Sequence, residues 1–132
     1  MSEHDEQVAL MNWAAIHLSN APELALLYAV PNGAKLPYKG KGKRRFSPEA
    51  MRLKEEGMKP GVPDVVLPVA RKEFHGMYIE LKYGKNKPTP EQIWWNEHLT
   101  EQGYLAVICW GWQEAAQVIS DYLGYALIEV SR

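Results

Sequence analysis

The stretch from Met77 to Trp110 constrains the fold most strongly, because it predicts a strand, a helix and a second strand in succession. Residues 77–82 alternate in character and residues 104–110 are a short apolar run, and both patterns are typical of strands. Between them, residues 89–92 (Thr-Pro-Glu-Gln) form a helix-capping sequence, and Gly103 ends the predicted helix. Two strands joined through a helix lie parallel in one sheet, with a right-handed crossover. This segment therefore predicts an α/β protein.

The remaining segments extend this unit to a mixed central β-sheet flanked by helices on both sides. A polar turn at residues 71–76 joins two strands that we expect to pair as a hairpin. The sequence contains no repeat and no long linker, so we expect its 132 residues to form a single domain, 1–132. The other expected elements are helices at 5–19, 48–57 and 113–123 and strands at 26–30, 64–69 and 125–130.

A basic block stands out in a chain whose net charge is only −1. No acidic residue occurs between Glu23 and Glu49, and such a block is a candidate surface for DNA phosphates. The alternative is an ordinary solvated loop. Lys85 and Lys87 follow the 77–82 strand and join the same proposed DNA contact. The basic residues of the block are Lys35, Lys39, Lys41, Lys43, Arg44 and Arg45, and Asn32 precedes them as a turn residue or a further DNA contact.

Three polar residues are expected to meet at the hairpin. Side chains two apart on a strand share a face, so Glu80 and Lys82 point the same way. Asp64 opens the partner strand after a rigid Pro-Gly-Val-Pro turn, and the start of one hairpin strand faces the end of the other. We therefore expect Asp64 and Glu80 to converge, with Lys82 beside them.

This combination suits phosphodiester hydrolysis. Two carboxylates can hold a hard divalent cation, and the Leu81 carbonyl is a further oxygen ligand that the strand would offer. An ammonium can orient water or stabilise developing negative charge. Taken singly, however, Glu80 and Lys82 would also fit an ordinary surface salt bridge, and Asp64 an ordinary turn residue.

The ordered motifs resemble the virus-type replication-repair nuclease (VRR-NUC) domain family, within the PD-(D/E)XK, restriction-endonuclease-like superfamily. The resemblance extends from the first helix to about Tyr122. The residues that carry it are Glu6, Val30-Pro31-Asn32-Gly33, Lys54-Glu55-Glu56-Gly57, Lys59-Pro60-Gly61-Val62-Pro63-Asp64, Ile79-Glu80-Leu81-Lys82, Thr89-Pro90-Glu91-Gln92, Trp95 and Gly103-Tyr104.

The resemblance implies a Mg²⁺- or Mn²⁺-dependent nuclease in which Asp64 and Glu80 bind the metal and Lys82 is the catalytic lysine. It adds Glu6 as an acidic residue that reaches the metal, with Glu3 and Asp5 as competitors for that role. It places Gln92 at the same site, although Gln92 would also fit a purely capping role. It further implies a homodimer, often encoded by phages, that acts on branched DNA such as four-way (Holliday) junctions in DNA repair.

Other functional classes find less support. The single Cys109 excludes an intrachain disulfide framework, and no Cys/His cluster has zinc spacing. The polar opening of the chain and the lack of a long apolar run predict a cytoplasmic protein, in a bacterial or phage-infected cell, with no membrane or small-molecule cofactor partner. The alternatives to a junction endonuclease are a non-catalytic nucleic-acid-binding module and an exonuclease or restriction-type nuclease of the same superfamily.

Overall fold

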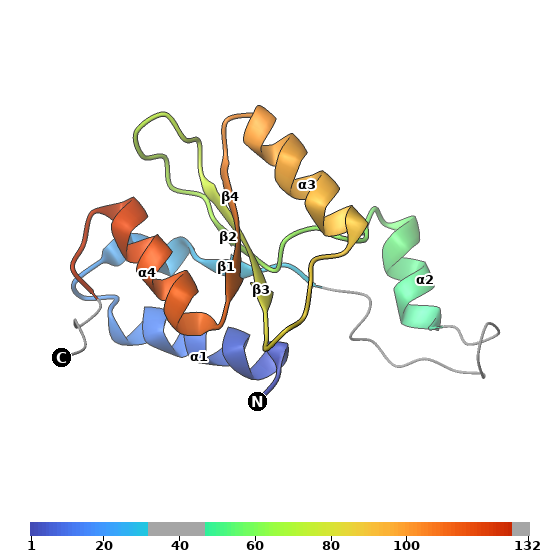
Figure 1. Cartoon of the computed structure of the whole chain (residues 1–132), viewed down its shortest axis with the longest axis horizontal. Coiled ribbons are helices and arrows are strands. Elements are labelled where there is room, and N and C mark those ends of the chain that lie inside the picture. Colours follow the sequence, from blue (N-terminus) through green and yellow to red (C-terminus); the bar gives the residue numbers. More distant parts are fainter. Residues whose placement is uncertain (32–46, 128–132) are drawn as a thin grey trace.

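A four-stranded mixed sheet with helices around it forms the structure, a computed structural model that describes residues 1–31 and 47–127 (Figure 1). The strand order is β1-β2-β3-β4. The elements are α1 (Glu3–Ile16), the 3₁₀ helix η1 (Pro22–Leu26), β1 (Tyr28–Ala29), α2 (Pro48–Glu55), β2 (Val65–Leu67), β3 (Met77–Lys82), α3 (Pro90–Glu101), β4 (Leu105–Trp110) and α4 (Trp112–Leu123).

The sheet topology agrees with the predicted pairing. β2 and β3 form an antiparallel hairpin in which Val65 pairs with Ile79, and β1 pairs antiparallel with the other edge of β2. β3 and β4 are parallel along their whole length, with α3 as the connection between them. The predicted mixed α/β sheet, its hairpin and its parallel crossover are therefore confirmed.

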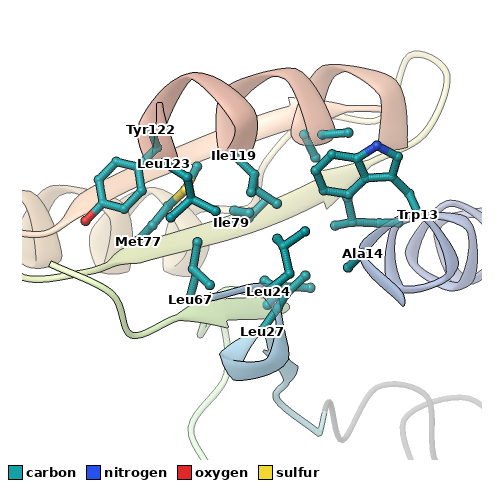
Figure 2. Close-up of a cluster of buried hydrophobic side chains, with 14 of the residues drawn as sticks. Trp13, Ala14, Leu24, Leu27, Leu67, Met77, Ile79, Ile119, Tyr122 and Leu123 are labelled. Atoms are coloured by element: carbon teal, nitrogen blue, oxygen red, sulfur yellow. The ribbon is translucent and has the colours of Figure 1, made fainter. Parts of the chain in front are cut away.

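The alternation of side chains on β3 separates the core from the polar residues. Met77, Ile79 and Leu81 are almost completely buried and face α1 and α4, where Figure 2 shows Met77 and Ile79 packed with Leu67 and Ile119. In Figure 1, α1 and α4 lie on one side of the sheet and α3 on the other. The opposite face of β3 therefore carries Tyr78, Glu80 and Lys82 beneath the α3 side of the sheet.

The segment before β1 differs from the prediction. We expected a strand at 26–30, but residues 22–26 form η1 and the strand is confined to Tyr28 and Ala29. Pro22 suits the first turn of a helix, and the 3₁₀ turn buries Leu24 and Leu27 on the core side together. The apolar run thus reflects a short helix packed on the core and not a longer strand.

Both ends of the described chain also depart from expectation. α1 begins at Glu3 instead of residue 5, because the Ser2 side chain accepts a hydrogen bond from the Asp5 N–H and caps the helix. Residues 125–127 are not a strand: Gly124 turns the chain with φ 81°, and the Tyr125 hydroxyl donates to Glu23. The rest of the expected strand, 128–130, lies outside the described residues.

No helix in the described ranges has the length and apolarity that crossing a membrane requires.

Candidate metal and nuclease site

The hairpin brings Asp64 and Glu80 together. Continuing the β2–β3 register by one residue beyond the Val65–Ile79 pair sets Asp64 opposite Glu80. The Oδ2 atom of Asp64 accepts a hydrogen bond from the Leu81 N–H at 2.8 Å, and the Asp64 carbonyl accepts one from Val30 N–H. Both carboxyl groups are buried, at 5% exposure for Asp64 and 3% for Glu80. Backbone pairing therefore fixes two neighbouring acids in a protected position.

Glu80 lacks a full set of partners. Its Oε2 atom accepts a hydrogen bond from Gln92 Nε2 at 3.0 Å and lies 3.8 Å from the Lys82 ammonium. Its Oε1 atom is buried and has no hydrogen-bond partner within the described residues. Burial, followed by the charge of nearby Asp64, raises the pKa of the Glu80 carboxyl well above its ordinary value, although Lys82 opposes the shift. Beside a second acid, a buried carboxyl oxygen with no partner among the described residues suits the binding of a cation.

Gln92 serves the helix cap and contacts Glu80 at the same time. Its Oε1 accepts from the Thr89 N–H at 2.9 Å, while the Thr89 hydroxyl accepts from the Gln92 N–H, which completes a capping box. Its Nε2 is left free to donate to Glu80. The same side chain thus caps the N-terminus of α3 as expected and links α3 to the acidic pair, and its catalytic role remains a prediction.

Replacing Gln92 by Ala is expected to lower Mg²⁺ affinity or activity about 10- to 100-fold, the range found when a group that orients a metal ligand is removed. Thr89→Ala is the matched control, because it removes the capping hydroxyl and costs about 1 kcal/mol but leaves the Glu80 contact in place. Calorimetric Mg²⁺ titration with thermal melts of both variants separates the two roles. Equal losses of Mg²⁺ affinity in both variants would contradict this assignment.

Two acids on α1 differ in their surroundings. Glu6 is buried, and its Oε1 accepts a hydrogen bond from Trp112 N–H at 2.8 Å, where it caps the start of α4. Glu3 is half-buried, accepts a hydrogen bond from Asn86 and adds a negative charge that raises the pKa of Glu80. Across residues 1–31 and 47–127, no three His, Cys, Asp or Glu side chains are close enough to share one metal ion. The structure thus brings Asp64 and Glu80 together without Glu6, whose metal role stays a prediction.

The Pro-Gly-Val-Pro turn packs directly on the first turn of α3. Gly61 has φ 86°, and a Cβ atom there would lie 2.6 Å from the backbone of Glu91. The Pro60 carbonyl accepts a hydrogen bond from Trp95 Nε1 at 3.1 Å. The turn thus sets the position of Asp64 relative to α3. The rigid turn was predictable from the sequence but this contact was not, because its only sequence signal is a Gly between two prolines.

Of the other predicted site residues, the structure describes Lys82, Lys85, Lys87 and Leu81. Lys82 is 5% exposed and reaches Glu80, whereas Lys85 and Lys87 are exposed on the loop after β3. The Leu81 carbonyl as a metal ligand, and both exposed lysines as DNA contacts, stay predictions. Outside the described residues lie Asn32, Lys35, Lys39, Lys41, Lys43, Arg44 and Arg45.

The comparison with protein families decides the classification. The VRR-NUC domain model matches residues 2–113, from the start of α1 to the start of α4. The chain belongs to the VRR-NUC domain family. It is therefore a nuclease domain, and it carries the Asp64, Glu80 and Lys82 arrangement on the expected hairpin.

Solved structures agree with this classification. A protein described as a VRR_NUC domain protein superposes with a TM-score of 0.72 and 27% identity, covering 94% of this chain and 89% of that one. No curated protein matches the sequence. The restriction-endonuclease-like α/β fold expected of this VRR-NUC domain is thus supported by a structure of similar length.

Proposed function

We propose that this VRR-NUC domain is a divalent-metal-dependent DNA endonuclease. The observation that carries the proposal is the buried pair of Asp64 and Glu80, with a Glu80 oxygen that has no partner among the described residues. Asp64 and Glu80 would hold Mg²⁺ or Mn²⁺, both of which prefer carboxylate oxygens. When bound, such an ion would lower the pKa of a water molecule and offset negative charge on the phosphate.

The residues of the chain have distinct roles in this proposal. The Leu81 N–H holds one oxygen of Asp64, and Gln92 holds one oxygen of Glu80, so both carboxylates are oriented before substrate arrives. The buried Lys82 ammonium stabilises negative charge on the phosphate or orients the attacking water. The family resemblance also assigns Glu6 to the metal, but the Glu6 carboxylate caps α4, and among the described residues no third acid lies close enough to share an ion with Asp64 and Glu80.

The substrate is branched DNA, such as a four-way junction, cut by a homodimer. A junction has two-fold symmetry, so two active sites related by a two-fold axis would cut both strands. Lys85, Lys87 and the basic block at 35–45 would contact phosphates and make binding salt-dependent.

In sedimentation, we expect a species of twice the 15.0 kDa chain mass, and a purely monomeric protein at assay concentrations would contradict the dimer.

Replacing Lys82 by Met tests the nuclease proposal directly. We expect junction cleavage in Mg²⁺ to fall about 10²- to 10³-fold, because an electrostatic stabiliser is lost while the apolar stem is retained. Calorimetry should still show Mg²⁺ binding, whereas Asp64→Ala should abolish it. The matched control is Lys54→Met on α2, an exposed lysine whose replacement should leave cleavage unchanged.

The choice of DNA decides between related functions. Wild-type protein is expected to cut a four-way junction faster than a linear duplex of the same sequence. A preference for duplex ends would support an exonuclease instead. Equal cleavage by wild type, Asp64→Ala and Lys82→Met would refute the enzyme and leave a non-catalytic DNA-binding module.

A further inference from the structure

A cleft of about 550 Å³ lies between the first turns of α3 and residues 59–60 and is not used by the proposed chemistry. This volume is within the usual range of ligand sites. Pro90 and Glu91 line it and directly precede Gln92, the residue that donates to Glu80. Trp94 follows Gln92 by two residues, so the two side chains project from nearly opposite faces of α3. The residues that line this α3 cleft are Lys59, Pro60, Pro90, Glu91, Trp94 and Trp95.

The two tryptophans of the α3 cleft are held in different ways. Trp95 is half-buried, and its Nε1 is fixed by the Pro60 carbonyl. Trp94 is 53% exposed, stacks on the His98 ring at a centroid distance of 4.0 Å and meets Trp95 edge-on at 5.5 Å. Trp94 is thus an aromatic ring that packs against His98 and Trp95 and still exposes part of its surface to solvent.

The charges around the α3 cleft favour a neutral aromatic ligand over a phosphate. Lys59 and Glu91 both line it, so the cleft carries one positive and one negative side chain and no net charge. A nucleobase offers a flat ring for stacking on Trp94, with carbonyl acceptors for Lys59 and amino donors for Glu91. A base within a duplex is stacked on both faces, so only an unpaired base can present its ring to Trp94.

We propose that the α3 cleft binds an unpaired nucleobase of the DNA substrate, with Trp94 as the stacking residue. This inference rests on the proposed nuclease function and extends it. The substrate would then carry unpaired nucleotides beside its duplex arms, and the enzyme would distinguish such DNA from continuous duplex through Trp94.

Binding without cleavage tests the proposal. A labelled ten-residue oligothymidine and a labelled 20-base-pair blunt duplex are titrated by fluorescence anisotropy in EDTA. Trp94→Ala should weaken oligothymidine binding about 5- to 150-fold, the range for loss of one base–aromatic stack, and change duplex binding less than about two-fold. Trp94→Phe, which keeps an aromatic ring, should bind within a few-fold of wild type.

The matched control is Ile93→Ala, an exposed apolar residue on the same helix that does not line the cleft. It should bind both DNAs like wild type. The proposal is overturned if wild type does not bind oligothymidine, if Trp94→Ala weakens both DNAs equally or neither, or if Trp94→Ala only changes the sedimentation of the protein.

Cleavage assays on the same variants separate this inference from the nuclease proposal. Trp94-dependent binding without Mg²⁺-dependent cleavage of any DNA would refute the nuclease and keep the base-binding cleft. Mg²⁺-dependent cleavage that is identical in wild type and Trp94→Ala on gapped and continuous duplex would refute the cleft alone.

Discussion

Glu80→Gln should reduce Mg²⁺-dependent cleavage about 10³-fold or more and, at the same time, raise the thermal stability of the metal-free protein at pH 8. The loss of activity follows because the amide cannot replace the carboxylate that holds the cation. The gain in stability follows because the buried Glu80 carboxylate lies beside Asp64 and has an oxygen with no partner among the described residues. We expect a rise in Tm of about 3–6 °C, which is roughly 1 kcal/mol for a chain of this size.

The pH dependence has a definite sign. The pKa of the Glu80 carboxyl is higher in the folded protein than in the unfolded chain. The protonated Glu80 side chain therefore contributes its full stabilisation below the unfolded-state pKa, and this stabilisation is lost as the pH rises towards the folded-state pKa. Metal-free wild type should therefore lose stability from acidic to alkaline pH. Melts at pH 5.5 and 8.5 should show this loss in wild type and a smaller loss in Glu80→Gln.

Two comparisons guard this result. Glu97→Gln changes an exposed acid on α3 and should leave the pH dependence of Tm as in wild type. Adding Mg²⁺ should raise the Tm of wild type more at pH 8.5 than at pH 5.5, because the ion binds the ionised carboxylates. A Glu80→Gln variant that is less stable than wild type at pH 8.5 without metal would contradict the role of Glu80.

Gly61→Ala is expected to destabilise the protein by about 2–4 kcal/mol, or about 8–16 °C in Tm, and to lower cleavage about 10²-fold. The φ of 86° is unfavourable for Ala, and the added Cβ would lie 2.6 Å from the Glu91 backbone. The turn and α3 must then move apart, which shifts Asp64 relative to Gln92. Chemical denaturation and Mg²⁺-dependent cleavage of a junction measure both effects.

Gly124 offers a closely matched control. Its φ is 81°, but a Cβ atom there would meet no atom of residues 1–31 or 47–127 within 4 Å. Gly124→Ala should therefore cost only the backbone term, about 1–2 kcal/mol, and leave the cleavage rate unchanged. If both alanine variants lost the same stability and the same activity, the contact between Gly61 and α3 would have no role in positioning the site.

The fold was largely predictable from local patterns. The alternation of side chains predicted the extent of β3, and the capping sequence at Thr89 predicted the start of α3. Both signals are local and strong. The strand predicted at 26–30 was too long, since only Tyr28 and Ala29 form β1 and the preceding apolar residues pack on the core in a 3₁₀ turn. Only the tertiary position of Leu24 and Leu27 distinguishes the 3₁₀ turn from a longer strand.

The site was predictable where it depended on strand register. Asp64 and Glu80 were expected to meet because both flank one hairpin, and the pairing sets them opposite each other. The capping of α4 by Glu6 and the influence of Glu3 on Glu80 were not predictable, because both depend on how α1 packs against distant elements. Two acids in the same helical turn look equivalent until their tertiary neighbours are known.

Because apolar and polar side chains alternate on β3, a change that shifts the strand affects the hydrophobic core and the acidic pair together. If one residue were inserted or deleted in the 71–76 connection and the hairpin slipped by one residue to compensate, Glu80 would turn inward and Ile79 outward. Such a slip would bury Glu80 in the hydrophobic core and expose Ile79, so the protein would lose stability whether or not its activity was under selection. Length changes in this connection should therefore be tolerated only where they leave the pairing frame intact, and the acidic pair is inherited together with the packing.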